Sequence, residues 1–217
     1  MLFVGLIESR AGTSVAGESL EALRLQLEGE LARCAAAVGR PLSEQATATE
    51  RVARATALAM LGETIRARET LEPCAAEHLG ACLLTASIYQ DERDYAKSAQ
   101  WYQKALAMTD MKREAEQAER DAGRLRAFEG IAFAARATRD FAASESTYRR
   151  ALGELPEHAA LLHYRLGQHY AAVGDAAAAV AAFDRAAAAD RSAYGDLVAG
   201  EIRRLRQTTP ACLPWGR

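Results

Sequence analysis

The sequence predicts an all-α fold, an α-solenoid of stacked antiparallel helical hairpins with flanking helices. Three observations support this. Ala, the strongest helix former, supplies 50 of the 217 residues. Aromatic residues make up only 6% of the chain, and the β-branched residues that favour strands are sparse. Small residues also recur at one spacing in several segments, which is typical of repeated helix pairs.

Charge is balanced along the chain. The 27 Lys and Arg residues face 29 Asp and Glu residues, and the formal net charge is −2. Binding to nucleic acid or to an anionic membrane surface requires an excess of cations, which this composition lacks. We therefore expect no nucleic-acid partner.

Residues 1–13 are expected to form a tail. Their apolar run, residues 2–7, is too short for a signal peptide or a membrane span and is followed at once by Glu8. The run is either an ordinary tail or the stub of a membrane anchor. Because no later stretch of about eighteen apolar residues is free of charge, we expect no membrane insertion of the chain as given. The expected location is cytoplasmic, or else the soluble domain of a membrane-anchored protein, and the cysteines, which form no Cys-x-x-Cys pair, are expected to be reduced.

An amphipathic helix is predicted over residues 14–38, within an amino-terminal segment 14–41. Gly39 and Pro41 are its stop signals. Its apolar stripe either covers the first hairpin or pairs with a second chain. Thr47 and Glu50 have the spacing of a capping box that begins the next helix. The stripe consists of Leu20, Leu23, Leu27, Leu31, Cys34 and Val38.

Three segments further along the chain share one pattern of small and aromatic residues. The small residues are expected where the two helices of each hairpin approach closely, and the aromatic residues, one turn later, where neighbouring hairpins meet. In the first helices the small residues are Ala86, Ala132 and Gly167; in the second helices they are Ser98, Ser144 and Ala179, and the aromatic residues are Tyr102, Tyr148 and Phe183.

This pattern resembles the tetratricopeptide repeat family, whose unit is about 34 residues long. The resemblance covers residues 79–112, 125–158 and 160–193, and residues 48–78 are similar to a degenerate unit in which Pro73 shortens the second helix. It implies a repeat region 42–193 that forms a right-handed superhelix. The chain departs from the family at the early Trp position, where Cys82, Phe128 and His163 stand.

Two further helical segments are predicted around these units. A charged insertion, residues 113–124, contains oppositely charged pairs four residues apart, such as Glu116 and Arg120. We expect it to extend a neighbouring helix, either as a solvated arm or as a docking feature. Residues 194–207 are expected to form a helix that caps the stack, with an irregular tail over 208–217. The apolar face of that helix comprises Tyr194, Leu197, Val198, Ile202 and Leu205.

No catalytic or cofactor-binding motif is present in the sequence, so we expect neither an enzyme nor a cofactor. Cys74, His78 and Cys82 are spaced by four, which on one continuous helix places the outer two roughly 12 Å apart, too far for one zinc ion. No metal site is therefore expected. His163 is expected to be a hydrogen-bonded core residue.

The resemblance implies that the first helices of the hairpins line a concave groove that binds a peptide or a protein. Phe133, Arg136 and Tyr164 are expected to form an aromatic floor with a cation at its edge, a composition typical of binding hot spots. We therefore expect a non-catalytic protein–protein interaction module, a scaffold or adaptor; the alternative is a structural module that self-assembles as a homo-oligomer. The predicted groove residues are Leu83, Ser87, Gln90, Arg126, Glu129, Phe133, Arg136, Tyr164 and Gln168.

Overall fold

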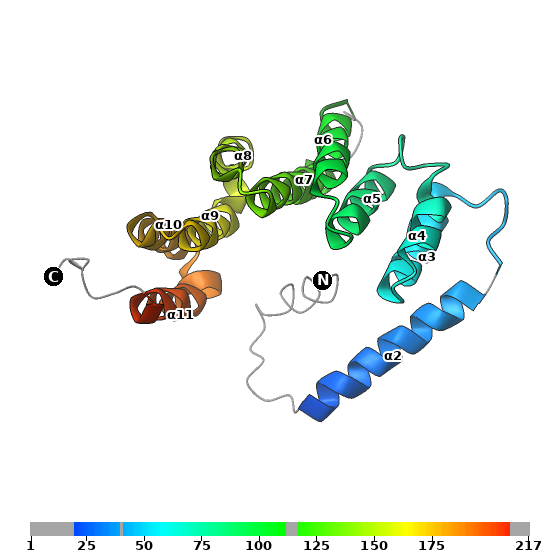
Figure 1. Ribbon diagram of the computed structural model, residues 1–217, viewed down its shortest axis with the longest axis horizontal. Coiled ribbons are helices and arrows are strands. Elements are labelled where there is room, and N and C mark those ends of the chain that lie inside the picture. The colour runs from blue at the N-terminus through cyan, green and yellow to red at the C-terminus, as the bar shows by residue number, and fades with distance from the viewer. Residues whose placement is uncertain (1–19, 40, 112–116, 209–217) are drawn as a thin grey trace. The chain divides into compact units, whose positions relative to one another are not determined.

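A computed structural model of the chain describes residues 20–39, 41–111 and 117–208 (Figure 1). Within these ranges it contains ten α-helices, one short 3-10 helix and no strand, so the predicted all-α class is confirmed. The predicted tail 1–13, residues 14–19 of the first helix, residues 113–116 of the charged insertion and residues 209–217 of the carboxyl-terminal tail lie outside the described residues. Thr208, predicted as the first residue of that tail, is instead the last residue of a helix. None of the described helices combines the length and apolar character that crossing a bilayer requires.

The helices follow one another with short connections. Their bounds are α2 Leu20–Gly39, α3 Ala48–Met60, α4 Thr64–Leu71, α5 Leu79–Asp91, α6 Tyr95–Met111, α7 Gln117–Ala137, α8 Phe141–Glu154, η1 Pro156–His158, α9 Ala159–Val173, α10 Ala176–Ala189 and α11 Arg191–Thr208.

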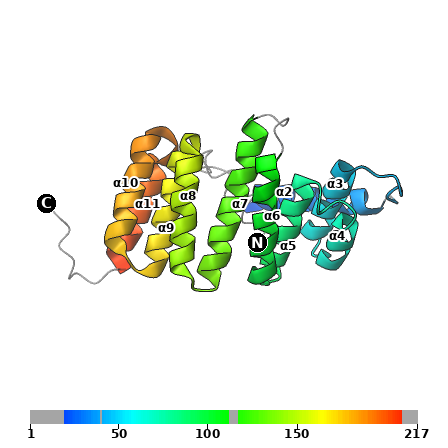
Figure 2. The ribbon, with the colours of Figure 1, turned by 90° about the horizontal axis from the view of Figure 1, so that it is seen from above.

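The chain divides within α7 into two compact units, Met1–Gly130 and Ile131–Arg217. In the first unit α3 packs on α4 and α5 on α6; in the second α9 packs on α8 and α10, and α11 packs on α10. Figure 2 shows α5 and α6 side by side as an antiparallel pair, and likewise α9 and α10. The hairpins α3–α4, α5–α6 and α9–α10 are thus present, whereas the handedness of a superhelix stays a prediction.

One turn geometry connects the two helices of each hairpin. The turn residues Gly62, Arg93, Arg139 and Gly174 all have positive φ, between 63° and 90°. The amide of the following residue donates to the carbonyl five residues earlier, as Asp94 does to Tyr89 at 2.9 Å. This is a helix-ending motif of the Schellman type, which satisfies carbonyls that would otherwise lack a donor. The degenerate first hairpin therefore keeps the turn of the others.

Side-chain caps then begin the second helices. Asp94, Asp140 and Asp175 each accept a hydrogen bond from the backbone amide three residues on, at 2.9 to 3.1 Å. Glu63, at the equivalent position of the first hairpin, makes no such bond. The capping box predicted at Thr47 and Glu50 is confirmed, since both of its reciprocal hydrogen bonds are present.

The predicted close approaches between helices are also confirmed. The small residues are buried, as are Tyr102, Tyr148 and Phe183. A Cβ added at Gly167 would lie 2.5 Å from the Phe183 ring, and one added at Gly130 would lie 2.2 Å from Tyr102. Both glycines are therefore required where an aromatic ring lies directly on a helix backbone.

α2 and α7 are both anchored within the first unit. The backbone carbonyl of Val38, near the end of α2, accepts a hydrogen bond from Arg54, and the Val38 side chain packs on the core of the first hairpin.

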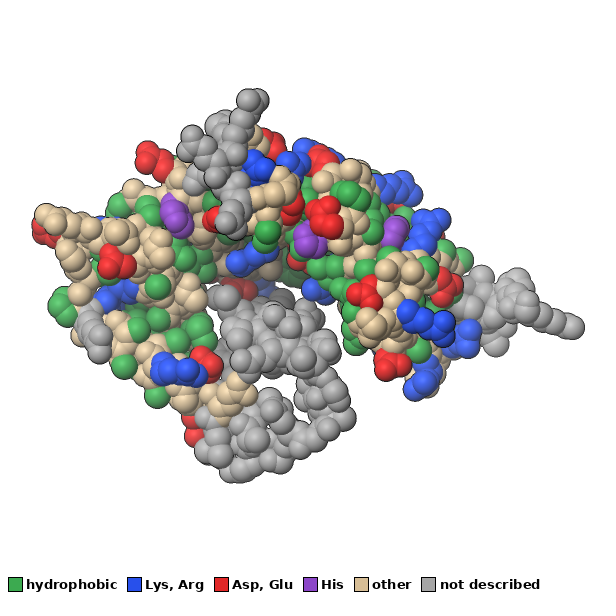
Figure 3. Space-filling view, turned by 180° about the vertical axis from the view of Figure 1, so that it is seen from behind, with side chains coloured by type: hydrophobic (Ala, Val, Ile, Leu, Met, Phe, Trp, Pro, Cys, Tyr) green, Lys and Arg blue, Asp and Glu red, His purple; other side chains and the backbone are tan. Residues whose placement is uncertain are grey.

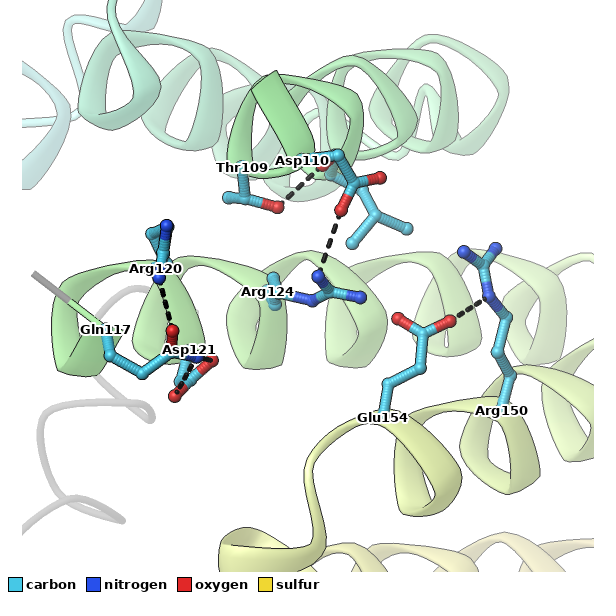
Figure 4. A network of polar contacts seen from close by, with 9 residues as sticks. Thr109, Asp110, Gln117, Arg120, Asp121, Arg124, Arg150 and Glu154 are labelled. Carbon is cyan, nitrogen blue, oxygen red and sulfur yellow. Dashed lines mark hydrogen bonds and ion pairs between the residues drawn. The ribbon is translucent and has the colours of Figure 1, made fainter. Parts of the chain in front are cut away.

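The described part of the charged insertion, residues 117–124, is helical and extends α7. It is not merely a solvated arm, because Gly123 is buried against Leu79 and Arg124 pairs with Asp110 at 2.9 Å (Figure 4).

The closing helix α11 begins at Arg191, three residues earlier than predicted, because Asp190 caps it by accepting from the Ala193 amide at 3.0 Å. Val198 and Leu205 pack on Phe183, with Tyr194 and Ile202 beside them. The prediction for Leu197 was wrong, since this side chain is 38% exposed and lies outside that cluster.

Candidate protein-binding surface

Phe133 and Arg136 form a cation–π pair on α7. The Arg136 guanidinium carbon lies 5.6 Å from the centre of the Phe133 ring, and both residues are half-buried. Their spacing of three places them on one side of the helix, as predicted. The contact holds a cation beside an aromatic surface that solvent partly reaches, and such pairs are stabilised by the ring quadrupole.

Arg126 and Glu129 precede this pair on the same helix at the same helical spacing. Arg126 is exposed and Glu129 half-buried. Both act on Tyr102, whose pKa rises to about 12 because burial penalises the phenolate; Arg126 lowers this pKa and Glu129 raises it. The two charges therefore lie near the buried ring of Tyr102.

On α5 the structure corrects one predicted groove residue. Leu83 is only 5% exposed, because α3, α4 and α6 all pack on α5 and cover most of its circumference. Ser87 and Gln90 are half-buried. The Ser87 hydroxyl donates to the Leu84 carbonyl at 2.9 Å, whereas the Gln90 side-chain oxygen is buried and accepts no hydrogen bond from the described residues.

On α9 the structure corrects a second expectation. The Tyr164 ring lies 5.6 Å from both Phe183 and Tyr194, and its hydroxyl contacts Glu201 at 3.4 Å. Tyr164 therefore packs against α10 and α11, whereas the sequence predicts it at the floor of the groove. Gln168, one turn further along α9, is half-buried and accepts from Arg165 at 3.1 Å.

The core histidine of the second unit is His169 and not His163. His163 is half-buried, and its Nδ1 has no hydrogen-bond partner among the described residues. His169 is 1% exposed and lies 3.1 Å from the Ser144 hydroxyl. Burial lowers the pKa of His169, Arg136 lowers it further, and Glu145 raises it.

The three residues spaced by four, Cys74, His78 and Cys82, make separate contacts. Cys74 lies in the turn after α4 and donates to the Leu71 carbonyl at 3.4 Å. His78 caps α5 by accepting from the Ala81 amide, and Cys82 donates to the Trp101 carbonyl at 3.3 Å. Across the described ranges, no cluster of three or more His, Cys, Asp or Glu residues is placed to hold a metal ion.

Sequence reasoning missed a pocket of about 430 Å³ in the first unit, formed by α4, the turn after it, α5 and α6. Two signals pointed to it: Pro73, which shortens the second helix of this hairpin, and Ile65, an apolar residue on the opposite side of α4 from Ala67 and Leu71. The lining residues are Ile65, Arg68, Glu69, Glu72, Ala75, Ala76, Thr85, Tyr89 and Trp101.

Comparison with protein families assigns the α5–α6 hairpin. The sequence model described as "Tetratricopeptide repeat" matches residues 79–109, which begin with α5 and end within α6. These residues form a tetratricopeptide repeat. The predicted resemblance is thereby confirmed for this hairpin, and such repeats are in general protein–protein interaction modules. No curated protein sequence matches the chain.

The described surface carries both signs of charge. Figure 3 shows Lys and Arg interspersed with Asp and Glu on the face in view. Several of these charges are paired within one helix, such as Arg150 with Glu154 and Arg149 with Glu145, each at 2.6 Å. Where charges of both signs are interspersed, long-range electrostatic attraction of a partner is weak. Such a surface therefore favours a partner that is recognised by local contacts.

Proposed function

We propose that this chain is a non-catalytic scaffold or adaptor whose partner, a peptide or a protein, binds along the first helices of its repeats. The observation that carries the proposal is the Phe133–Arg136 pair, a partly exposed aromatic ring with a cation held over it. Aromatic residues and Arg dominate binding hot spots, because each buries a large area and Arg adds directed hydrogen bonds.

The chemistry of α7 suggests which partner would fit. An apolar or aromatic side chain would pack on Phe133, while Arg126 and Arg136 would favour acidic groups on either side of it. Glu129, between them along the helix, would limit how acidic those flanks can be. Leu83 is not part of this surface, because its side chain is buried.

The test begins with affinity capture by the native chain and identification of the bound proteins. The variant Phe133→Ala with Arg136→Glu should weaken binding of a captured partner by about 2 kcal/mol or more, the size of a hot spot. A matched control is Arg203→Glu on α11, which reverses an exposed Arg elsewhere. Circular dichroism must show that all three proteins keep their helical fold. Unchanged affinity of the double variant would reject this surface.

Self-assembly as a homo-oligomer is the competing function. Leu197 favours it, because this side chain is exposed on α11 while the rest of the helix's apolar face is packed. Sedimentation equilibrium distinguishes the two functions. A mass of 23.4 kDa that does not change with concentration would exclude self-assembly. A dimer that Leu197→Glu dissociates would instead support it.

A further inference from the structure

The pocket between α4, α5 and α6 exists because the second helix of the first hairpin is short. α4 has 8 residues, whereas α8 and α10, its counterparts in later hairpins, each have 14. Pro73 lacks the backbone donor that a longer helix requires. The chain therefore turns away after Leu71, and part of the face of α5 and α6 stays open to solvent.

The lining of this pocket is largely apolar. Ile65 at its rim is 63% exposed, the largest exposed fraction among the large hydrophobic residues that the structure describes. Trp101, Ala75 and Ala76 also line it. Thr85 is only 5% exposed and lines the pocket too, with its hydroxyl unpartnered in the described part of the chain. An exposed aliphatic residue beside an aromatic hollow is a feature of protein-interaction sites.

The aromatic rings of the pocket already carry cations of the chain itself. Arg68 and Lys97 lie 4.9 and 5.2 Å from the centre of the Tyr89 ring, and Lys104 lies 4.7 Å from that of Trp101. A further cation would be repelled from these rings. The centre of the pocket therefore suits an uncharged, apolar side chain.

The rim, in contrast, suits cations. Arg68 is paired with Glu92 at 3.4 Å and Lys97 with Asp94 at 2.9 Å, so these charges are largely balanced. Glu69 and Glu72 are exposed, line the pocket and form no ion pair within the described ranges. Both stand at the carboxyl-terminal end of α4, where the helix dipole adds to their negative potential.

We propose that this pocket binds a peptide segment of a partner protein in which one aliphatic side chain is flanked by Lys or Arg. The aliphatic group enters beside Trp101 and Ala76, and the flanking cations pair with Glu69 and Glu72. This site is distinct in residues and in charge preference from the α7 surface, whose arginines favour acidic flanks.

The probe is the acetylated peptide Lys-Lys-Leu-Lys-Lys, titrated into the full chain carrying Trp215→Phe, so that Trp101 is the only Trp left. Binding beside the indole should shift its emission and saturate below about 1 mM peptide. Replacing the central Leu by Ser, or the four Lys by Glu, should weaken binding about tenfold or more. Added salt should weaken binding of the parent peptide.

Protein variants locate the site. Glu69→Gln with Glu72→Gln should weaken binding about tenfold and remove most of its salt dependence. Ala76→Phe, which fills the pocket from an exposed turn, should abolish binding. The matched control is Glu77→Gln, an exposed Glu on the same turn that does not line the pocket. Helical circular dichroism of every variant should equal that of the parent.

The outcomes separate this proposal from the function proposed for α7. Loss of peptide binding in the pocket variants but not in the Phe133 and Arg136 variant supports the pocket. No saturable signal up to about 1 mM, binding that survives Ala76→Phe, or equal binding of the Ser peptide would each overturn it. The α7 proposal would stand or fall separately on capture of its own partner.

Discussion

The first and last hairpins of the described chain begin alike and end differently. In α3–α4 and α9–α10 alike, a glycine with positive φ, Gly62 or Gly174, ends the first helix. α4 then stops after 8 residues and leaves an open pocket, whereas α10 continues for 14 and is covered by α11. The length of the second helix thus determines whether the chain itself covers the apolar face beside the hairpin or leaves that face open to a partner.

The two aromatic residues at these places show the same difference. Phe183 is fully buried between α9, α10 and α11, with a Gly167 backbone too close for a Cβ. Trp101 packs on the core of the first hairpin and also lines the pocket. A ring enclosed on all sides stabilises the fold, while a half-enclosed one can still contact a partner.

The largest expected effect tests this contrast directly. Phe183→Ala should lower the free energy of unfolding by about 3–5 kcal/mol, because a fully buried ring leaves a cavity. Trp101→Ala should cost below about 2 kcal/mol, because solvent already reaches part of that ring. Urea unfolding followed by circular dichroism measures both. Equal losses would mean that the pocket is closed in solution.

A smaller effect is expected at the glycines of the second unit. Gly167→Ala should cost about 1–3 kcal/mol, since its Cβ would clash with Phe183. Gly153→Ala is the matched control, because no atom lies within 4 Å of a Cβ placed there. That change should be neutral or stabilising by up to about 1 kcal/mol, since Ala is the better helix former. Similar losses at both glycines would contradict the packing of Phe183.

The smallest expected effect is a dependence of stability on pH. It is expected from the last hairpin and not from the first, because the core of the first hairpin contains no His. Burial holds the pKa of His169 below its usual 6.5, so the unfolded chain binds more protons there. The stability from the neutral ring is complete above about pH 6.5 and is lost as pH falls through the folded-state pKa. His169→Gln should therefore make the free energy of unfolding less dependent on pH between about pH 7 and pH 5. If the free energy of unfolding of the variant depends on pH as that of the parent does, protonation of His169 in the folded protein costs no free energy.

The sequence predicted most of the fold because local rules carry it. Helix propensity, the Thr47 and Glu50 capping box and the spacing of small and aromatic residues all depend on near neighbours. The sequence could equally predict the cation–π pair of Phe133 and Arg136, since residues three apart share a helix face. Asp190 was missed as a cap although it too is a local signal, and recognising it would have moved the start of α11 to Arg191.

The side chains that other helices cover could not be assigned from their own segment. Leu83 satisfies the spacing of a groove residue but is buried, because three helices surround α5. Tyr164 has the same spacing yet packs under α11, and His169, not His163, enters the core. Periodicity gives the face of a helix, while burial depends on how many neighbours reach that face.

The sequence by itself determined the helical class, the hairpin turns and the residues that let helices approach closely, because each follows from propensity and from contacts within a few turns. Only the tertiary structure decided which faces remain open. Pro73 predicts a short α4, but the pocket depends on the positions of Tyr89 and Trp101, contributed by helices further along the chain. Enclosure is a property of several helices at once, and no single segment of the sequence encodes it.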